Sequence, residues 1–346
     1  MAKSAQWTPF HAQLHRTLLH RKLLPKNQRL LVAVSGGQDS LCLIKLLLDL
    51  QPKWGWQLAI AHCDHRWRPD SEANANYVEE LAQSWQVVCY RQTADEILKS
   101  EAAARQWRYH VLTEVALTNH YPYIVTGHTA SDRAETLLYN LVRGTGIDGL
   151  SALTWQRPLN ASTEVENILN DPFSVHLIRP LLGFTRTQTA QFCQEQNLKI
   201  WEDTTNQDLQ YARNRIRSEL LPLLHHFNPQ AELAIARTSE LLRADAEYLE
   251  QVATEWLEQV IAPAKTREDL QHLPLQLNRR LLRQAPLALQ RRVMRQVLQQ
   301  ILPIAPSFEQ IEKLTDLIQA PNRSQTDPFP GGAIAQVDDP WISIHL

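Results

Sequence analysis

A segment rich in serine and glycine is the first part of the chain whose residues suggest chemistry. Ser35-Gly36-Gly37-Gln38-Asp39-Ser40 directly follows an apolar run and opens a predicted helix. Backbone N–H groups at a helix N-terminus, adjacent glycines and hydroxyl groups together bind a phosphate-sized anion. The lysine of a Walker P-loop does not follow, and the GxGxxG pattern of dinucleotide sites is absent. The segment therefore predicts a phosphate site of another kind, which we favour over a tight turn with capping side chains.

A second polar cluster follows the next predicted strand. His62, Asp64 and His65 lie at the carboxyl edge, where open α/β sheets bind their ligands. Two histidines and an aspartate suit zinc, but no fourth ligand stands nearby in the sequence. We therefore predict that His62 and Asp64 contact a nucleotide. Arg66-Trp67-Arg68 comes next and leaves two interpretations open, stacking on RNA or shaping a surface loop.

Acidic side chains follow the fourth predicted strand. Gly127 and His128 end that strand, and Asp132 and Glu135 share one face at the start of the next helix. Two carboxylates in this position could simply balance the helix dipole. They could also form a pocket for a cationic amine or a metal ion, and we favour this interpretation. Arg143-Gly144 ends the same helix, either as an ordinary C-cap or, as we favour, in close approach to a nucleotide or RNA.

Arginine makes up 26 of the 35 basic residues, and its planar fork suits phosphate. No acidic residue occurs between Leu270 and Phe308, a stretch that holds six arginines: Arg279, Arg280, Arg283, Arg291, Arg292 and Arg295. Such a run alone indicates a solvated helix face, but the missing acids favour a polyanion-binding face. Further upstream, Arg213, Arg215 and Arg217 also offer phosphate contacts, with structural ion pairing an equally good explanation for at least one of them.

Hydrophobic patterning predicts the elements that must position these residues. Short apolar runs indicate strands at residues 29–34, 57–61, 87–91, 123–126 and 176–181. Helical patterns separate the first four strands and follow the fourth, at residues 40–50, 71–85, 97–117 and 132–143. This alternation predicts right-handed βαβ units and an α/β fold with a doubly wound parallel sheet.

The pattern changes after about residue 220. Residues 231–260 lack glycine and proline and predict one long helix or a broken pair, followed by a linker at 261–274. Residues 328–346 alternate like a small hairpin. We predict a catalytic domain over residues 1–220 and a mainly helical domain over 221–346 that ends in a short β-hairpin.

Composition excludes several classes of protein. A hydrophobic content of 44% and a charged content of 21% are typical of folded chains. No apolar run approaches the roughly 18 residues that span a bilayer, and the first ten residues lack the core of a signal peptide. The four cysteines form no CxxC pair, which favours neither a disulfide framework nor a zinc site. We expect a cytoplasmic protein without membrane contact, and a homodimer stays open.

The motifs together resemble those of a known family. Ser35–Ser40 resembles the pyrophosphatase loop of the N-type ATP pyrophosphatases, the PP-loop superfamily, which split ATP into AMP and pyrophosphate. Within that superfamily the chain resembles the tRNA(Ile)-lysidine synthetase (synthase) family. The resemblance covers residues 30–224 and rests on five further motifs in order: AHCDH (61–65), EAAARQWRY (101–109), GHTASDRAETLLYNLVRGTGIDGL (127–150), RPLL (179–182) and EDTTN with YARNRIR (202–206 and 211–217).

The resemblance implies roles for the candidate residues. Ser35–Ser40 would cradle pyrophosphate, Asp39 would hold Mg²⁺, and Arg105 or Arg108 would balance the charge of adenylation. Asp132 and Glu135, with His128 beside them, would contact the substrate L-lysine. The family often has two adjacent acids where this chain has Ser131-Asp132. The second domain would grip the tRNA.

The activity implied is the ATP-dependent ligation of lysine to C2 of the wobble cytidine, position 34, in the minor isoleucine tRNA with a CAU anticodon. An adenylated cytidine would be the intermediate. Three alternatives stay open: another PP-loop enzyme such as a tRNA 2-thiolase, a glutamine-dependent amidotransferase, and a non-catalytic tRNA-binding protein. A thiolase needs paired cysteines, and none of the four here is paired.

Overall fold

The computed structural model describes residues 7–67, 69–98, 100–151, 153–159, 174–201, 208–262 and 275–345. Arg68, the EDTTN motif at 202–206 and most of the predicted linker lie outside these ranges. The chain divides into two compact units, Met1–Leu242 and Arg243–Leu346, so the division falls inside a helix and not at the predicted position after residue 220. Residues 221–242 belong to the first unit because they pack against it.

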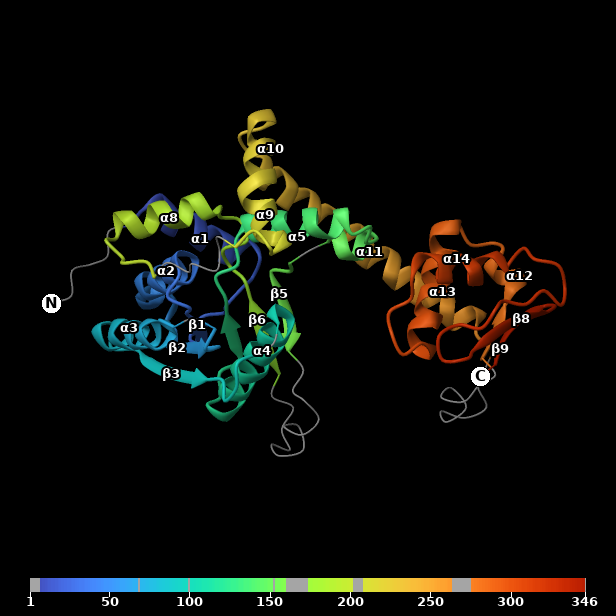
Figure 1. Cartoon of the computed structure of the whole chain (residues 1–346), viewed down its shortest axis with the longest axis horizontal. Coiled ribbons are helices and arrows are strands. Elements are labelled where there is room, and N and C mark those ends of the chain that lie inside the picture. The colour runs from blue at the N-terminus through green and yellow to red at the C-terminus, as the bar shows by residue number, and fades with distance from the viewer. Residues whose placement is uncertain are drawn as a thin grey trace. The chain divides into compact units, whose positions relative to one another are not determined.

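The first unit contains a six-stranded sheet with the strand order β3-β2-β1-β4-β6-β5 (Figure 1). Its strands are β1 (Arg29–Ala33), β2 (Gln57–Asp64), β3 (Val88–Thr93), β4 (Tyr123–Val125), β5 (Gln156–Leu159) and β6 (Val175–Ile178). Five strands run parallel, and β5 pairs antiparallel with β6 at one edge. The predicted doubly wound α/β fold is confirmed, and β5 is an addition that the sequence did not predict.

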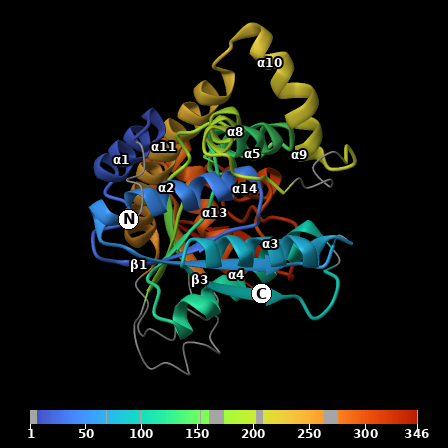
Figure 2. The same ribbon diagram turned by 90° about the vertical axis from the view of Figure 1, so that its left-hand side faces the viewer.

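Helices cover both faces of this sheet. The helical segments of the first unit, up to the helix that crosses the division, are α1 (Pro9–His20), α2 (Gln38–Trp54), α3 (Ser71–Ser84), α4 (Glu101–Thr118), α5 (Ala130–Val142), α6 (Ile147–Leu150), α8 (Arg186–Glu195), α9 (Ala212–Arg215), the π-helix η2 (Ile216–Leu220) and α10 (Leu221–Phe227). Figure 2 shows α2 and α3 on one side of the sheet and α4 on the other. The alternation of β1 explains this arrangement, since Leu30 and Val32 pack with α2 while Leu31 packs with α4.

The long helix α11 (Ala231–Val260) is continuous, as one of the two predictions for this segment stated. Beyond it, the second unit contains β7 (Leu275–Asn278), α12 (Arg279–Leu282), α13 (Leu287–Ile301), α14 (Phe308–Asp316), β8 (Ile334–Asp338) and β9 (Trp341–His345). The predicted terminal hairpin is β8 and β9, and β7 extends it to a sheet of order β7-β9-β8. This sheet and helices α11, α13 and α14 enclose a separate apolar core. Among the described residues, no helix has the length and apolar character needed to cross a membrane.

Candidate functional site

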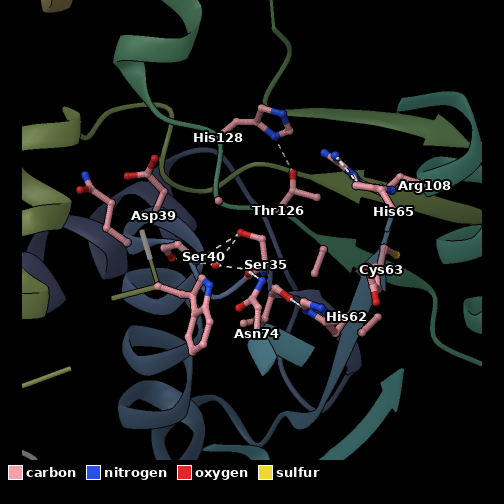
Figure 3. Close-up of a pocket in the computed structure, with 18 of the residues that line it drawn as sticks. Ser35, Asp39, Ser40, His62, Cys63, His65, Asn74, Arg108, Thr126 and His128 are labelled. Carbon is pink, nitrogen blue, oxygen red and sulfur yellow. Dashed lines mark hydrogen bonds between the residues drawn. The ribbon is translucent and has the colours of Figure 1, made fainter. Parts of the chain in front are cut away.

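A cavity of about 750 Å³ lies in the first unit, a size suited to a nucleotide-sized ligand. Its lining comes from the ends of β1, β2 and β4 and from the first turn of α2. Eight predicted nucleotide contacts line it: Ser35, Gly37, Gln38, Asp39, Ser40, His62, Asp64 and Gly127. Figure 3 shows several of these side chains around the same space. The parallel strands therefore bring together residues that are up to about a hundred positions apart in the sequence.

The loop between β1 and α2 is a tight turn held by several hydrogen bonds. Gly36 has φ +86°, a conformation that glycine adopts without strain. Ser40 Oγ donates to the carbonyl of Gly37 at 2.8 Å and accepts from the N–H of Ser35 at 3.2 Å. Asn74 donates to the carbonyl of Ser35 at 3.0 Å, and the N–H of Trp201 donates to Gly36 at 3.0 Å. The loop is thus held from α3 and from the segment after α8, by two residues that the sequence analysis did not single out.

Gly127 brings β4 into close contact with this loop. A Cβ atom at position 127 would lie 2.8 Å from the carbonyl oxygen of Asp39 and 3.0 Å from the N–H nitrogen of Ser40. Both are backbone atoms, so the neighbours cannot yield by a change of rotamer. Glycine is required here by close backbone approach.

The histidines and aspartate after β2 are fixed by the backbone. His62 is buried, its Nδ1 lies 2.8 Å from the carbonyl oxygen of Val34, and burial lowers its pKa. Asp64 accepts from the N–H of Arg66 at 2.8 Å, and Arg66 has φ +56°. Arg66 thus has a left-handed conformation, which glycine adopts with less strain than arginine. Among the described residues, no group of three His, Cys, Asp or Glu side chains is placed so that it could hold a metal ion.

Two cations beside the cavity differ in their placement. Arg108 lines it, and its Nη2 lies 2.8 Å from Nε2 of His65 (Figure 3). Arg105 packs over the ring of Tyr109, with its guanidinium 5.2 Å from the ring centroid, and does not line the cavity. His128 lies 2.9 Å from Thr126 Oγ1, and burial lowers its pKa to about 3, so the imidazole is neutral at physiological pH.

The three predicted acids converge on one residue that the sequence analysis missed. Arg186, the first residue of α8, pairs with Asp132 and with Glu135, each at 2.8 Å, and lies 3.4 Å from Asp39. Arg217 pairs with both oxygens of Glu135, at 2.7 and 2.9 Å. The acid pocket predicted for a cation therefore holds two guanidinium groups of the protein itself. The motif RPLL directly precedes this segment and was the available signal for Arg186.

Each acid has a distinct environment. Glu135 is 3% exposed and its oxygens are engaged by arginine. Asp132 caps α5 through Thr129 and lines the cavity. Burial alone would raise the pKa of Asp132, but Arg186, His128 and the Thr129 hydrogen bonds together lower it. Burial raises the pKa of Asp39 despite the opposing effect of Arg186.

Ser131, where the family often has an acid, has an acidic partner from elsewhere in the chain. Its hydroxyl donates to Glu232 of α11 and accepts from the N–H of Arg186 at 2.9 Å. A carboxylate thus still lies next to position 131, and it comes from α11.

Several predicted residues lie elsewhere. Arg143 and Gly144 are not among the described residues that line the cavity. Gly144 has φ +74° and its N–H donates to Leu141 at 3.0 Å, which is the helix-end geometry of the alternative interpretation. Arg213 and Arg215 pair with Glu101 at 3.6 Å and Glu219 at 3.3 Å.

The arginines of the second unit also have structural partners. The absence of acidic residues near them in the sequence was therefore not evidence that they lack such partners. Arg279 is 2% exposed and donates to the carbonyls of Ile318 and Ala320, and Arg283 also donates to Ile318. The other four pair with acids from distant segments: Arg280 with Asp339, Arg291 with Glu312, and Arg292 and Arg295 with Glu250. The fold supplies the partners that the local sequence lacks.

Comparison with known proteins places the chain in a family. The profile of a PP-loop domain matches residues 8–224, and that of a TilS substrate binding domain matches residues 277–337. The chain is 65% identical over 345 residues to the tRNA(Ile)-lysidine synthase of a Nostoc species, covering 98% of this chain and 97% of that protein. It is 49% identical over 340 residues to the enzyme of the same name from a Synechocystis species, covering 97% of each.

A solved structure supports the fold at lower similarity. The U34-tRNA thiolase NcsA from Methanococcus maripaludis, with its [4Fe-4S] cluster, matches with a TM-score of 0.55 and 17% identity, over 68% of this chain and 78% of that one. This likeness concerns the fold alone. Family profiles, relatives and fold agree, and the chain belongs to the tRNA(Ile)-lysidine synthase family of PP-loop proteins.

Proposed function

We propose that the protein uses ATP to ligate L-lysine to C2 of the wobble cytidine in the minor isoleucine tRNA. The observation that carries this proposal is the placement of Asp39, Asp132 and Arg186 in one cavity with the PP-loop. The C2 oxygen of cytidine attacks the α-phosphate of ATP and pyrophosphate leaves. The ε-ammonium of lysine then gives up a proton, for which Asp132 in the cavity is the candidate base, and the free amine attacks C2 as AMP leaves. We also propose a cytoplasmic location, where these substrates occur.

The PP-loop would bind the phosphates through its backbone N–H groups and hydroxyls. Asp39 suits Mg²⁺ because it is a carboxylate in the cavity whose contact with Arg186 is long, at 3.4 Å. Bound there, the ion would neutralise phosphate oxygens as charge develops on them. Of the two candidate arginines, we assign this electrostatic role to Arg108, since it lines the cavity and His65 orients it.

The lysine site is assigned by which groups face the cavity. Asp132, Arg186 and Arg217 line it, whereas Glu135 does not. Asp132 would bind an ammonium group of lysine, and the two arginines would bind its carboxylate. Glu135 would contribute indirectly, by holding Arg186 and Arg217 in position for the substrate. Single-stranded anticodon bases reach such sites by being splayed out of the loop.

The thiolase alternative is disfavoured by the state of the cysteines. All four are free thiols, and Cys42 and Cys193 are buried. Cys63 lines the cavity, but burial raises its pKa to about 12, and it raises that of Cys89 to about 11. The thiolate is the reactive form, so these thiols are poor nucleophiles at neutral pH.

One assay tests the proposal. The protein is incubated with unmodified minor isoleucine tRNA, ATP, Mg²⁺ and labelled lysine, and label in the tRNA is measured together with AMP and pyrophosphate. We expect label in the tRNA. Pyrophosphate without label would reduce the proposal to the superfamily activity, and tRNA binding without AMP would favour the non-catalytic alternative.

A variant tests the role of Asp39. Asp39→Asn removes the negative charge that the metal needs, so we expect pyrophosphate release to be abolished. Because burial disfavours the charged form of Asp39, this variant should fold at least as well as the wild type at pH 7. Full activity in a folded Asp39→Asn protein would refute the metal role.

A further inference from the structure

A second cavity in the first unit has no part in the function proposed above. Its volume is about 490 Å³, and α1, α5, α8 and the first part of α11 contribute to its lining. The charged and titratable side chains that line it are Arg16, His20, Arg21, Arg133, Arg237 and Glu240. Four arginines face one glutamate, whereas the whole chain has a net charge of −2. The cavity is therefore a local centre of positive charge.

The glutamate offsets one of the four positive charges of this cavity and orders the arginines that it contacts. Glu240 pairs with Arg21 and with Arg133, the latter at 3.4 Å, and accepts from Trp155 Nε1 at 3.3 Å. The two guanidinium groups lie 4.3 and 5.2 Å from the centroid of the Trp155 ring. Arg133 also donates to the carbonyl of Leu153 at 2.8 Å. These contacts fix two cations and an indole as a rigid wall.

The other two arginines are exposed. Arg16 of α1 donates to the carbonyl of Ala12 in its own helix, at 3.3 Å. Within the part of the chain that the structure describes, neither Arg16 nor Arg237 of α11 takes part in an ion pair with an acidic side chain. Exposed guanidinium groups beside a fixed cationic wall form an arrangement that recognises phosphate oxygens.

We propose that this cavity binds phosphate groups of the tRNA backbone near the nucleotide that is modified. Two helices connect it with the catalytic cavity. In α5, Asp132 lines the catalytic cavity and Arg133 the second one, and in α8 the same holds for Arg186 and Gln188. A helix is about 10–12 Å across, so a bound RNA strand would reach from one cavity to the other within a few nucleotides. This inference rests on tRNA being the substrate.

The test uses a double variant and a matched control. Arg16→Gln with Arg237→Gln removes both exposed cations of the cavity. Lys26→Gln with Lys53→Gln removes the same charge from exposed side chains of the same unit that line neither cavity. The association constant falls as salt rises, and each lost phosphate contact makes the slope of log K against log salt less negative by about 0.7–0.9. We expect the slope of the double variant to be less negative by about 1.5 and its tRNA binding to be weaker roughly tenfold at low salt.

Kinetics separate this role from others. We expect the KM for tRNA to rise in the double variant, with kcat at saturating tRNA and the KM for ATP unchanged. An equal loss of tRNA affinity in the lysine control would overturn the inference, since it would show that binding depends on the total positive charge of the unit and not on this cavity. A raised KM for ATP with unchanged tRNA binding would also overturn it, because the phosphate bound would then belong to a free nucleotide. A wild type that binds tRNA without ligating lysine would refute the proposed function alone, because tRNA binding tests the cavity separately.

Discussion

Arg186 joins carboxylates from two helices, and this makes it the most informative single residue. Asp39 comes from α2, and Asp132 and Glu135 come from α5. Its guanidinium attracts all three carboxylates and so offsets the repulsion between their negative charges. Burial alone would lower the pKa of Arg186, but the surrounding carboxylates raise it overall. The residue is a permanent cation at the centre of the site.

Replacing Arg186 should cost stability. Among the contacts described above, Arg186→Gln leaves the buried Glu135 with Arg217 as its remaining cation. Removing one partner of a buried ion pair lowers the free energy of unfolding, because the remaining charge stays buried without full compensation. Because Arg186 is 26% exposed, we expect a loss of about 2–3 kcal/mol in the free energy of unfolding. Denaturant unfolding measures it. The control is Arg215→Gln, a surface pair with Glu219, which should change stability by no more than about 0.5 kcal/mol. Equal effects of the two substitutions would contradict a structural role for Arg186.

The pH dependence of adenylation should follow Asp39. Its raised pKa means that protonation sets in above the ordinary range of an aspartate. Protonated Asp39 cannot ligate Mg²⁺, so kcat/KM for ATP should fall as the pH falls through this raised value. His128, with a pKa of about 3, is neutral on both sides of that step. The pH profile of pyrophosphate release measures the effect. A profile that is flat down to pH 4 would show that Asp39 is not the titrating group.

At the scale of elements, the contact between β4 and the start of α2 determines the shape of the PP-loop. Gly127→Ala would put a Cβ atom 2.8 Å from the backbone oxygen of Asp39. We expect a loss of about 1–3 kcal/mol in stability, as for other overpacked positions, and a higher KM for ATP because the loop moves. Thermal unfolding and ATP titration measure these effects.

Another glycine provides the control for that substitution. Gly146 has an ordinary φ of −66°, and an added Cβ would meet nothing within 4 Å. Gly146→Ala should therefore leave both quantities close to the wild type. If Gly127→Ala behaved in the same way, the backbone contact would not constrain the loop.

The elements of the sheet were predictable because their signals are local. The apolar run of β1 and the glycine turn after it are contiguous in the sequence, so a phosphate-binding loop could be predicted from the residue pattern, and the resemblance identified it as a PP-loop. The acidic partners of Arg186 were not predictable in this way, since the three carboxylates that contact its guanidinium are 51 to 147 positions away. β5 was missed because Arg157 and Pro158 interrupt its apolar pattern.

The second unit shows the same limit for charge. The six arginines were predicted to bind a polyanion because no acid lies near them in sequence. Glu250 and Glu312 reach Arg292 and Arg291 only through packing of α11 and α14 against α13. A direct role of these arginines in RNA binding stays a prediction, and for Arg279 burial opposes it.

At the scale of the molecule, Arg279 connects the elements of the second unit. Its guanidinium satisfies the carbonyls of Ile318 and Ala320 beyond α14. Arg279→Gln would remove this donor from the carbonyl of Ala320, while the carbonyl of Ile318 keeps Arg283, and we expect a loss of about 1–3 kcal/mol in the free energy of unfolding. Calorimetry of the full chain measures it.

The neighbouring residue offers the comparison. Arg280 is 66% exposed at its side chain and pairs with Asp339, so Arg280→Gln should cost no more than about 1 kcal/mol. If Arg279→Gln left stability unchanged but weakened tRNA binding, the original RNA-binding prediction would be restored for this residue.

Helix α5 is a wall shared by two cavities, because Asp132 and Arg133 point into different ones. A rotation of this helix about its axis would change both cavities at once. By thermodynamic linkage, if a ligand in one cavity changes the affinity of the other cavity for its ligand by some factor, the second ligand changes the affinity for the first by the same factor. If RNA held at Arg133 tightens the binding of lysine beside Asp132, lysine must tighten the binding of that RNA by the same factor.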